Sequence, residues 1–371
     1  MTIARPTILI LTTYTGGGHL NLAQALKGML EACYEVVIVN PQFPLADHFY
    51  AAVSRHCLKF LNWQYTWTDN ENASLWLHRI ITLFDSRRIL GIIECVQPQL
   101  IITTHALLSY ATARANERCQ KRVPLVFQLT DLGQVHMTWF TEKHVDAYFA
   151  PTREIFAQAQ AQGSDKNRLY LTGRPVRRQF WEASPDARGE TLSALKLDPA
   201  ILTIFLQGGA KGSASVDRTI ESLLSAGVPT QIMLAVGNNK EMAARYVRHE
   251  RIRPLPFTET IAPYMAAADV IAGKAGASFI SEAFVLEKPF LVTTFIPGQE
   301  TPNLEFIERH NLGWVCQGRA ALQELLATIA SNQRMIAEKV ASIRAYKTWN
   351  RQANQHICPI IDQLLKEASD Q

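Results

Sequence analysis

Short apolar runs rich in β-branched residues recur along the chain, separated by longer stretches with helical periodicity. Runs of this kind predict buried parallel strands, because a strand covered on both faces needs no polar side. One series of runs covers 7–13, 35–39, 99–104, 124–130, 146–150 and 168–172. A second series covers 201–207, 230–236, 252–255, 269–273, 289–294 and 313–316. The pattern predicts an α/β protein with two doubly wound, Rossmann-like domains that face a cleft.

The domain boundaries follow from where the strand pattern fades. With 371 residues the chain exceeds the usual size of one hydrophobic core. The pattern weakens at 173–178, and we interpret the polar stretch 182–190 as the interdomain linker. We expect an N-terminal acceptor or membrane domain over 1–178 and a C-terminal nucleotide-binding domain over 179–335. We expect a helical tail over 336–371, which could cross back onto the first domain.

The composition excludes several classes of protein. The chain is 47% hydrophobic with a net charge of only +4 and no dense basic run, which argues against nucleic acid as a partner. A mild positive charge still permits attraction to an anionic membrane surface. No apolar run is long enough to span a bilayer and no signal-peptide pattern is present, so we expect a cytoplasmic protein peripheral to the membrane. The six cysteines and ten histidines lack metal-binding spacing, so no metal or other cofactor is expected.

Three glycines, Gly16, Gly17 and Gly18, follow the first predicted strand and precede a helix. A strand, a glycine turn and a helix in this order aim backbone N–H groups at a ligand at the carboxyl edge of the sheet. His19 comes directly after the turn and is a candidate general base. The alternative is a tight turn with a histidine that only caps the helix.

The second predicted domain has three comparable loops. A glycine turn at 207–213 follows its first strand, a turn of small residues at 273–278 precedes a helix with Glu282, and Gln299-Glu300 lies on a tight turn. A helix N-terminus suits a diphosphate, and a carboxylate one turn along suits a ribose diol. Capping chemistry is the alternative for each loop alone, whereas the three together favour a nucleotide-sugar site.

An aromatic insertion interrupts the first series between 43 and 88. Amphipathic segments there flank Trp63-Gln64-Tyr65-Thr66-Trp67, with arginines and lysines interspersed. Aromatic and cationic side chains on amphipathic helices are typical of a bilayer surface. Core packing explains most aliphatic positions, but the cluster from Trp63 to Trp67 favours an acceptor or membrane surface.

Seven ordered motifs resemble those of GT-B glycosyltransferases of family 28, in particular the branch of monogalactosyldiacylglycerol synthases and diacylglycerol glucosyltransferases. They are Gly16–His19, Pro98–His105, Thr130–Leu132 with His136–Phe140, Gly173–Arg177, Lys274–Gly276, Ser281–Ala283 and Gly298–Glu300. The resemblance covers about 8–317 and leaves out the C-terminal tail.

This resemblance implies roles for single residues. His19 is the base or orients the acceptor, Glu282 binds ribose, and Gln299 with Glu300 recognises the donor sugar. Phe257 lies in the segment that pairs with uracil. The complete donor set is Gly18, Gly208, Gly209, Phe257, Gly276, Ala277, Ser278, Glu282, Gln299 and Glu300, and the acceptor or membrane set is Trp63, Tyr65, Trp67, His136 and Trp139.

The implied reaction is metal-independent, inverting transfer of a hexose from a UDP-sugar to a lipid hydroxyl, that of diacylglycerol. Ala277-Ser278-Phe279 departs from the Pro-Gly-Thr that family members carry after Lys-Ala-Gly. Three alternatives therefore stay open: another acceptor, such as a polyprenyl-linked sugar or a small metabolite, a UDP-sugar epimerase, and a degenerate nucleotide-sugar-binding protein.

Overall fold

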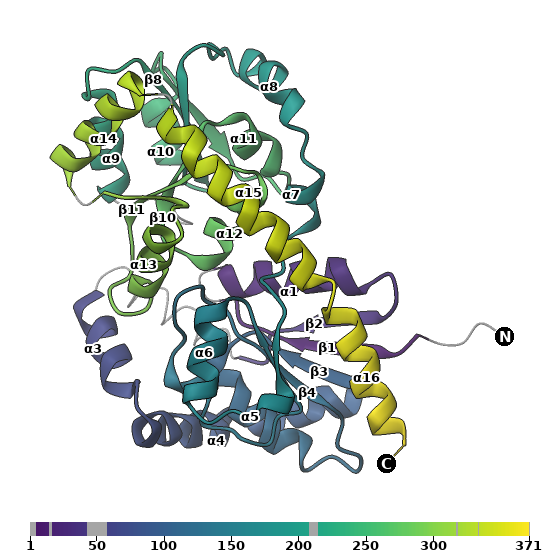
Figure 1. The fold of residues 1–371 in the computed structure, drawn as a ribbon. Coiled ribbons are helices and arrows are strands. Elements are labelled where there is room, and N and C mark those ends of the chain that lie inside the picture. Colours follow the sequence, from purple (N-terminus) through teal and green to yellow (C-terminus); the bar gives the residue numbers. More distant parts are fainter. Residues whose placement is uncertain are drawn as a thin grey trace. The chain divides into compact units, whose positions relative to one another are not determined.

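The computed structural model describes residues 5–14, 17–42, 58–207, 214–316, 318–332 and 334–370. These residues form two compact units, each with its own sheet (Figure 1). Unit 1 consists of Met1–Arg178, Ile296–Asn303 and Trp349–Gln371, and unit 2 consists of Gln179–Phe295 and Leu304–Thr348. The predicted fold class of two parallel, doubly wound sheets is confirmed.

The sheet of unit 1 has six parallel strands in the order β2-β1-β3-β4-β5-β6. The strands are β1 (Thr7–Leu11), β2 (Glu35–Val39), β3 (Leu100–Thr103), β4 (Leu125–Gln128), β5 (Ala147–Ala150) and β6 (Leu169–Leu171). Its helices are α1 (Gly18–Leu30), α3 (Leu58–Thr68), α4 (Glu71–Val96), α5 (Ala106–Asn116), α6 (Arg153–Ala161) and α16 (Ile357–Ser369), with short 3₁₀ turns η1 (Met137–Trp139) and η2 (Lys166–Arg168). Ile8 of β1 pairs with Val36 of β2 and with Leu100 of β3, so β1 lies between these two strands.

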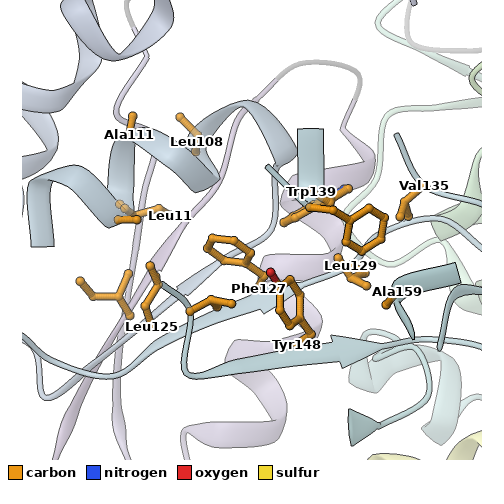
Figure 2. Packing of buried hydrophobic residues seen from close by; sticks show 14 of the residues in the cluster. Leu11, Leu108, Ala111, Leu125, Phe127, Leu129, Val135, Trp139, Tyr148 and Ala159 are labelled. Atoms are coloured by element: carbon orange, nitrogen blue, oxygen red, sulfur yellow. The ribbon is translucent and has the colours of Figure 1, made fainter. Parts of the chain in front are cut away.

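Alternate residues of β1 enter two different cores, as a strand covered on both faces requires. Ile8 and Ile10 pack with α1 and with Ile357 and Ile361 of α16. Leu9 and Leu11 pack on the opposite face, under α4, α5 and α6. Figure 2 shows this second core, in which the rings of Phe127, Tyr148 and Trp139 meet.

The sheet of unit 2 also has six parallel strands, in the order β12-β11-β10-β7-β8-β9. The strands are β7 (Leu202–Gln207), β8 (Thr230–Gly237), β9 (Ile252–Pro256), β10 (Val270–Lys274), β11 (Phe290–Thr294) and β12 (Gly313–Val315). The helices are α7 (Arg178–Glu182), α8 (Arg188–Ala194), α9 (Ala214–Leu224), α10 (Lys240–Tyr246), α11 (Ala262–Ala267), α12 (Ala277–Val285), α13 (Thr301–Arg309), α14 (Arg319–Ser331) and α15 (Arg334–Asn354), with one 3₁₀ turn, η3 (Pro185–Ala187). Three of them cross the unit boundary, because residue 178 of α7, residues 301–303 of α13 and residues 349–354 of α15 belong to unit 1. Apolar residues of β7, α9 and α14 form one of its cores.

Two segments differ from simple expectation. The stretch interpreted as a linker, 182–190, lies in unit 2 and contains η3 and the start of α8. The loop Ile296–Asn303, which carries Gln299 and Glu300, belongs by its contacts to unit 1 although the strand before it, β11, belongs to unit 2. Among the residues that the structure describes, no helix combines the length and the hydropathy that a membrane span requires.

Candidate functional site

The turn between β1 and α1 brings His19 to the carboxyl edge of the unit 1 sheet. Gly17 is the N-cap of α1 and has a φ of 76°, in the left-handed region that favours glycine. Gly18 is the first residue of the helix and His19 the second. Gly16 lies outside the described residues. A parallel α/β sheet places ligands at this edge, so the local geometry suits the proposed base.

A backbone hydrogen bond fixes the imidazole of His19. Its Nδ1 lies 2.8 Å from the carbonyl oxygen of Thr104, which follows β3. A carbonyl only accepts hydrogen bonds, so Nδ1 carries the proton of the neutral ring and Nε2 keeps its lone pair. Thr104 is itself held by a hydrogen bond of 2.9 Å from its hydroxyl to that of Thr12. This is the arrangement that a general base needs.

A second histidine, His105, lies edge-on to His19, with ring centroids 4.3 Å apart. Its Nδ1 accepts a hydrogen bond of 3.2 Å from the N–H of Leu107 and so caps α5. Burial, and then the neighbouring His19, lower the pKa of His105 well below its ordinary value, so this ring is neutral at physiological pH. His105 occurs in a motif of the resemblance, but periodicity and spacing gave it no role beside His19.

In unit 2 the turn after β10 and the start of α12 give the donor loop its shape. Gly273 has a φ of 159°, and a Cβ there would lie 2.9 Å from the ring of Phe279. Gly276 is the N-cap of α12 and supplies no capping side chain, and Ala277 and Ser278 begin the first turn of the helix. The amides of a first helical turn point outward and attract anions.

Phe279 is a core residue, which explains the departure from the family pattern at this position. Its ring is 8% exposed and meets the ring of Phe290 at 5.2 Å in a T-shaped arrangement. It therefore fills space beneath the donor turn instead of pointing toward a ligand. Glu282, one turn farther along α12, is 5% exposed. A buried carboxylate is costly to retain for packing alone.

The turn with Gln299 and Glu300 is closed by its own hydrogen bonds. Oε2 of Glu300 accepts the N–H of Ile296 at 2.8 Å, and the hydroxyl of Thr301 accepts the N–H of Gly298 at 3.1 Å. Glu300 is 4% exposed and Gln299 is half-buried. One carboxylate oxygen of Glu300 thus shapes the turn, which leaves Gln299 as the more accessible of the two predicted sugar contacts.

The remaining predicted donor residues have less structural description. Phe257 follows β9, is 66% exposed, and its N–H donates to the carbonyl of Gly237 at 3.1 Å. Gly208 and Gly209 lie outside the described residues, as does the rest of their turn to Ser213. Within the described ranges, no three His, Cys, Asp or Glu side chains gather to hold a metal ion.

The acceptor set divides into exposed and buried members. Trp63 and Trp67 on α3 are 58% and 50% exposed, and their rings are stacked 6.0 Å apart. Trp76 on α4 is 55% exposed and meets Trp67 at 6.2 Å. These three indoles form an aromatic surface, which we call the tryptophan cluster.

Tyr65 and His136 pack together instead of facing solvent. Their rings are 4.6 Å apart, and Nε2 of His136 lies 3.1 Å from the carbonyl oxygen of Tyr65. Nδ1 of His136 accepts the N–H of Thr138, so Nε2 carries the proton and donates to that carbonyl. In this structure His136 fastens α3 to the turn at η1.

Trp139 corrects the sequence interpretation. The sequence analysis assigned it to the acceptor or membrane set, but it is 2% exposed and packs against Phe127 in the core of unit 1 (Figure 2). Phe140 beside it is fully buried. A ring enclosed by the core cannot touch a bilayer, so the exposed aromatic residues are those of α3 and α4.

Helix α4 exposes apolar side chains and buries polar ones. Its buried polar residues are Ser74, His78, Asp85 and Ser86, and the ring of His78 stacks on that of Tyr110 of α5. Leu83 and Phe84 are 78% and 67% exposed. Burial lowers the pKa of His78 to about 4, and its Nε2 lies 3.0 Å from the carbonyl oxygen of Thr138. The fully buried side chains of α4 are thus polar from Ser74 to Ser86 and apolar at Ile89 and Ile93, which join the core of unit 1.

The structure thus brings His19 and His105 together, and also Tyr65 with His136. In unit 2 it brings Gly276, Ala277, Ser278 and Glu282 onto one short helix. Reasoning from spacing missed the carbonyl of Thr104, which no side-chain pattern encodes. It also gave no role to Asp131 and Arg174, which lie in motifs of the resemblance and prove to be close to the Ile296–Asn303 loop.

Comparisons with known proteins agree with this geometry. Residues 39–176 match the family model of monogalactosyldiacylglycerol (MGDG) synthase, and residues 203–352 match that of the glycosyltransferase family 28 C-terminal domain. The chain is 25% identical to monogalactosyldiacylglycerol synthase 3 of Arabidopsis thaliana, over 90% of this chain and 76% of that protein.

Solved structures share the fold at low sequence identity. Anabaena HepE in complex with UDP-glucose is 16% identical with a TM-score of 0.58, over 97% of this chain and 100% of that chain. MurG of Acinetobacter baumannii is 14% identical with a TM-score of 0.59, over 97% of this chain and 99% of that chain. These similarities show the GT-B fold.

Proposed function

Because the chain belongs to the monogalactosyldiacylglycerol synthase family, with a C-terminal domain of glycosyltransferase family 28, we propose that it transfers a hexose from a UDP-sugar to the hydroxyl of diacylglycerol. The observation that carries the proposal is the orientation of His19, whose Nδ1 lies 2.8 Å from the carbonyl oxygen of Thr104. That contact leaves Nε2 as the proton acceptor. The names and titles of similar proteins support the same choice of donor and acceptor class.

The acceptor hydroxyl is a weak nucleophile until a base takes its proton in the transition state. Nε2 of His19 accepts that proton while the oxygen attacks the anomeric carbon, and the bond from that carbon to the UDP oxygen breaks. One displacement at this carbon inverts its configuration.

The leaving UDP carries the developing negative charge. The first turn of α12, at Gly276, Ala277 and Ser278, supplies amides and the positive end of a helix dipole for that charge. Glu282 lies one turn later on α12, and we assign its carboxylate to accept hydrogen bonds from the ribose hydroxyls. Gln299 and Glu300 are assigned to the transferred sugar, Phe257 to the uracil, and Gly208, Gly209 and Gly18 to the diphosphate side.

The lipid acceptor requires that the protein reach a membrane surface, and the exposed face of α4 supports this part of the proposal. Trp76, Arg79, Leu83 and Arg87 follow each other at helical spacing, and all four are exposed. Apolar side chains inserted at the interface and arginines at the lipid phosphates are the chemistry of an interfacial helix. The tryptophan cluster extends the same surface onto α3.

The test is product analysis with the purified protein. UDP-galactose, UDP-glucose and UDP-N-acetylglucosamine are supplied together with vesicles containing dioleoylglycerol, and mass spectrometry identifies the products. We expect a monohexosyl diacylglycerol in which the anomeric configuration is inverted. The His19→Ala variant should give no such product above background, whereas His356→Ala, at an exposed histidine of the same unit, should behave as the unmodified protein does.

Other products would replace the proposal by one of its rivals. Conversion of a UDP-sugar without lipid identifies an epimerase. Binding of UDP-sugars without turnover identifies a binding protein, and activity only with polyprenyl-linked or water-soluble acceptors identifies a transferase with a different acceptor. Equal activity of His19→Ala and the unmodified protein contradicts the role of His19 alone.

A further inference from the structure

The Ile296–Asn303 loop, which carries Gln299, is anchored on the turn that contains Leu132 and Gly133. The buried amide of Asn303 accepts the N–H of Leu132 at 3.0 Å. A Cβ at Gly133 would lie only 2.0 Å from the carbonyl oxygen of Pro302. On its other side, Gly298 has a φ of 78°, and a Cβ there would lie 2.7 Å from Oδ1 of Asn62. The loop is therefore seated closely between two parts of unit 1.

Charged side chains lie where this loop meets unit 1. Arg174 is 2% exposed, and its guanidinium donates a hydrogen bond to the carbonyl of Thr130. Asp131 follows Thr130 and lies close enough to Arg174 to be attracted and to Glu300 to be repelled. The side chain of Asn303 also hydrogen-bonds to Asp131. We call Asp131, Arg174, Glu300 and Asn303 the loop anchor.

The backbone at Arg174 is fixed as well. Oδ1 of Asn350 accepts the N–H of Arg174 at 2.7 Å, and the amide of Asn350 donates to the carbonyl of Arg174 at 3.0 Å. Gly173 before it has a φ of 70°, and a Cβ there would lie 2.7 Å from Asn350. The guanidinium thus extends from a rigid support toward Asp131.

The charge on Asp131 lowers the stability of the protein at neutral pH. Burial, and secondarily Glu300, raise the pKa of Asp131 to about 6, against the opposing effects of Arg174, Asn303 and Thr130. A carboxyl whose pKa is higher in the folded than in the unfolded state stabilises the fold when protonated, so stability falls as pH rises from about 4 to about 6. Tyr65 faces Asp131 from α3 and stays neutral, since burial raises its pKa. A destabilising charge is a mark of a residue kept for activity.

From this geometry we propose that Asp131 and Arg174 are positioning residues for donor selection: they hold the Ile296–Asn303 loop so that Gln299 meets the sugar of the UDP-sugar. The proposal rests on the proposed function, because it takes Gln299 as a sugar contact. It adds two residues that act through the loop, since the contacts described for them are with the loop and its surroundings in unit 1. Their effect should therefore appear in the sugar-dependent part of binding alone.

The direct test compares binding of UDP-galactose or UDP-glucose with binding of UDP, by calorimetry without an acceptor. The ratio of the two dissociation constants isolates the sugar contacts. We expect Asp131→Asn, which keeps the shape and removes the charge, to weaken UDP-sugar binding about 3- to 10-fold, as the loss of one or two hydrogen bonds predicts. The dissociation constant of UDP should stay unchanged. The melting temperature at pH 7 should rise, because a buried charge is removed.

The pH dependence supplies a second readout. In the unmodified protein the affinity for UDP-sugar relative to that for UDP should fall as pH falls from 7.5 to 5.5. Protonation of Asp131 weakens its attraction to Arg174 and its hydrogen bond from Asn303. In Asp131→Asn the relative affinity for UDP-sugar should already be low and should stay constant over this pH range. Asp165→Asn is the matched control: Asp165 is an exposed helix cap, and asparagine caps equally well. It should keep the behaviour of the unmodified protein.

A double-mutant cycle shows whether Asp131 acts through Gln299. In the Gln299→Ala background, Asp131→Asn should cause no further loss of sugar-dependent affinity, because interacting residues are non-additive. Additive losses, an unchanged ratio in Asp131→Asn, or a parallel loss of UDP affinity would each overturn the proposal. If the unmodified protein binds neither UDP nor a UDP-sugar, the proposed function itself fails.

A measurement on the unmodified protein covers the case in which the variant does not fold. Hydrogen exchange of the Ile296–Asn303 amides, corrected for intrinsic rates, should be slower at pH 5.5 than at pH 7.5, because protonation of Asp131 removes the buried charge that opening of the loop would expose to water, with no matching change in β1 or β3. Equal protection of the loop at both pH values would contradict the anchoring role of Asp131.

Discussion

Unit 1 and unit 2 share a six-stranded parallel sheet but present different chemical groups at the turns that follow their strands. In unit 1 the turn after β1 presents a side chain, the imidazole of His19, which a carbonyl holds in place. In unit 2 the turn after β10 presents the backbone amides at the start of α12, where the N-cap Gly276 supplies no side chain. Side chains move protons and backbone amides stabilise anions, so the difference predicts which step each unit serves.

The two units also differ in the hydrophobic residues that they expose. In unit 1, α16 buries Ile357, Ile360 and Ile361 as a conventional amphipathic helix, whereas α4 exposes Leu83 and Phe84. The large exposed hydrophobic residues of unit 2, among those described, are Val247, which follows α10, and Phe257, which follows β9. A contiguous apolar surface is unusual on a soluble protein and indicates an interaction site. Unit 1 is therefore the unit we assign to the lipid.

The largest expected effect comes from a change in unit 1 that abolishes proton transfer and leaves donor binding by unit 2 intact. His19→Ala removes the base, and loss of a general base lowers turnover by roughly 10²- to 10⁴-fold. The affinity for UDP-sugar should change little, because the proton moves only in the transition state. Steady-state kinetics together with calorimetry checks both statements. Near-normal turnover in the variant would remove His19 from the mechanism.

The next effect inverts that pattern in unit 2. Glu282→Ala should weaken UDP and UDP-sugar by the same factor, since both ligands contain the ribose. Hydrogen bonds to a charged acceptor contribute about 1.5–3 kcal/mol, which corresponds to roughly 10- to 100-fold in affinity. Glu305→Ala, at an exposed position of α13 in the same unit, is the control and should bind normally. If UDP affinity is unchanged in Glu282→Ala, the buried carboxylate serves only its own helix.

How far the sequence predicts these features depends on whether a residue's role is local. The β-branched runs that became the strands are local signals, as is the glycine turn before His19, so both were predictable. The faces of α4 were not, because contacts with later elements decide them: the buried His78 meets Tyr110 of α5 and the carbonyl of Thr138 in η1. Trp139 shows the same limit: its motif lies next to His136, but the core of unit 1 encloses the ring.

The loop anchor shows a second limit. Asp131, Arg174 and Asn303 are separated by long stretches of sequence and meet only in the folded unit. Periodicity describes single elements, and no spacing rule joins a turn after β4 to a loop after β11. The orientation of His19 is also set by a backbone carbonyl, which every residue type supplies. The sequence therefore points to His19 as the candidate base but not to the partner that fixes its tautomer.

A smaller effect tests whether the exposed face of α4 gives unit 1 a membrane-binding surface that unit 2 lacks. Leu83→Ser with Phe84→Ser should reduce binding to vesicles that contain anionic lipid about 10-fold, because partial burial of two apolar side chains contributes on the order of 1–2 kcal/mol. Melting temperature and UDP affinity should remain normal, since both side chains are largely exposed. Vesicle binding should also weaken with salt, because screening acts within about 8–10 Å of the arginines at ordinary ionic strength.

The matched control for this surface is Val247→Ser, at an exposed hydrophobic residue of unit 2. It should leave vesicle binding as it is. A loss of stability in the α4 variant with unaltered vesicle binding would mean that Leu83 and Phe84 pack within the protein, and the contrast between the two units would then vanish.

The smallest expected effect concerns the Ile296–Asn303 loop, which follows β11 of unit 2 but belongs to unit 1. It tests which of the two units selects the sugar. Gln299→Ala should raise the dissociation constant of UDP-sugar by a few fold, because an uncharged hydrogen bond contributes about 0.5–1.5 kcal/mol. UDP affinity should stay constant, and discrimination between UDP-galactose and UDP-glucose should weaken, since a site that pairs sugar hydroxyls rejects the epimer through unpaired groups. Calorimetry with the three ligands measures both effects. Equal losses for UDP and UDP-sugar would move Gln299 from sugar recognition to the nucleotide, and selectivity would then have to come from unit 2.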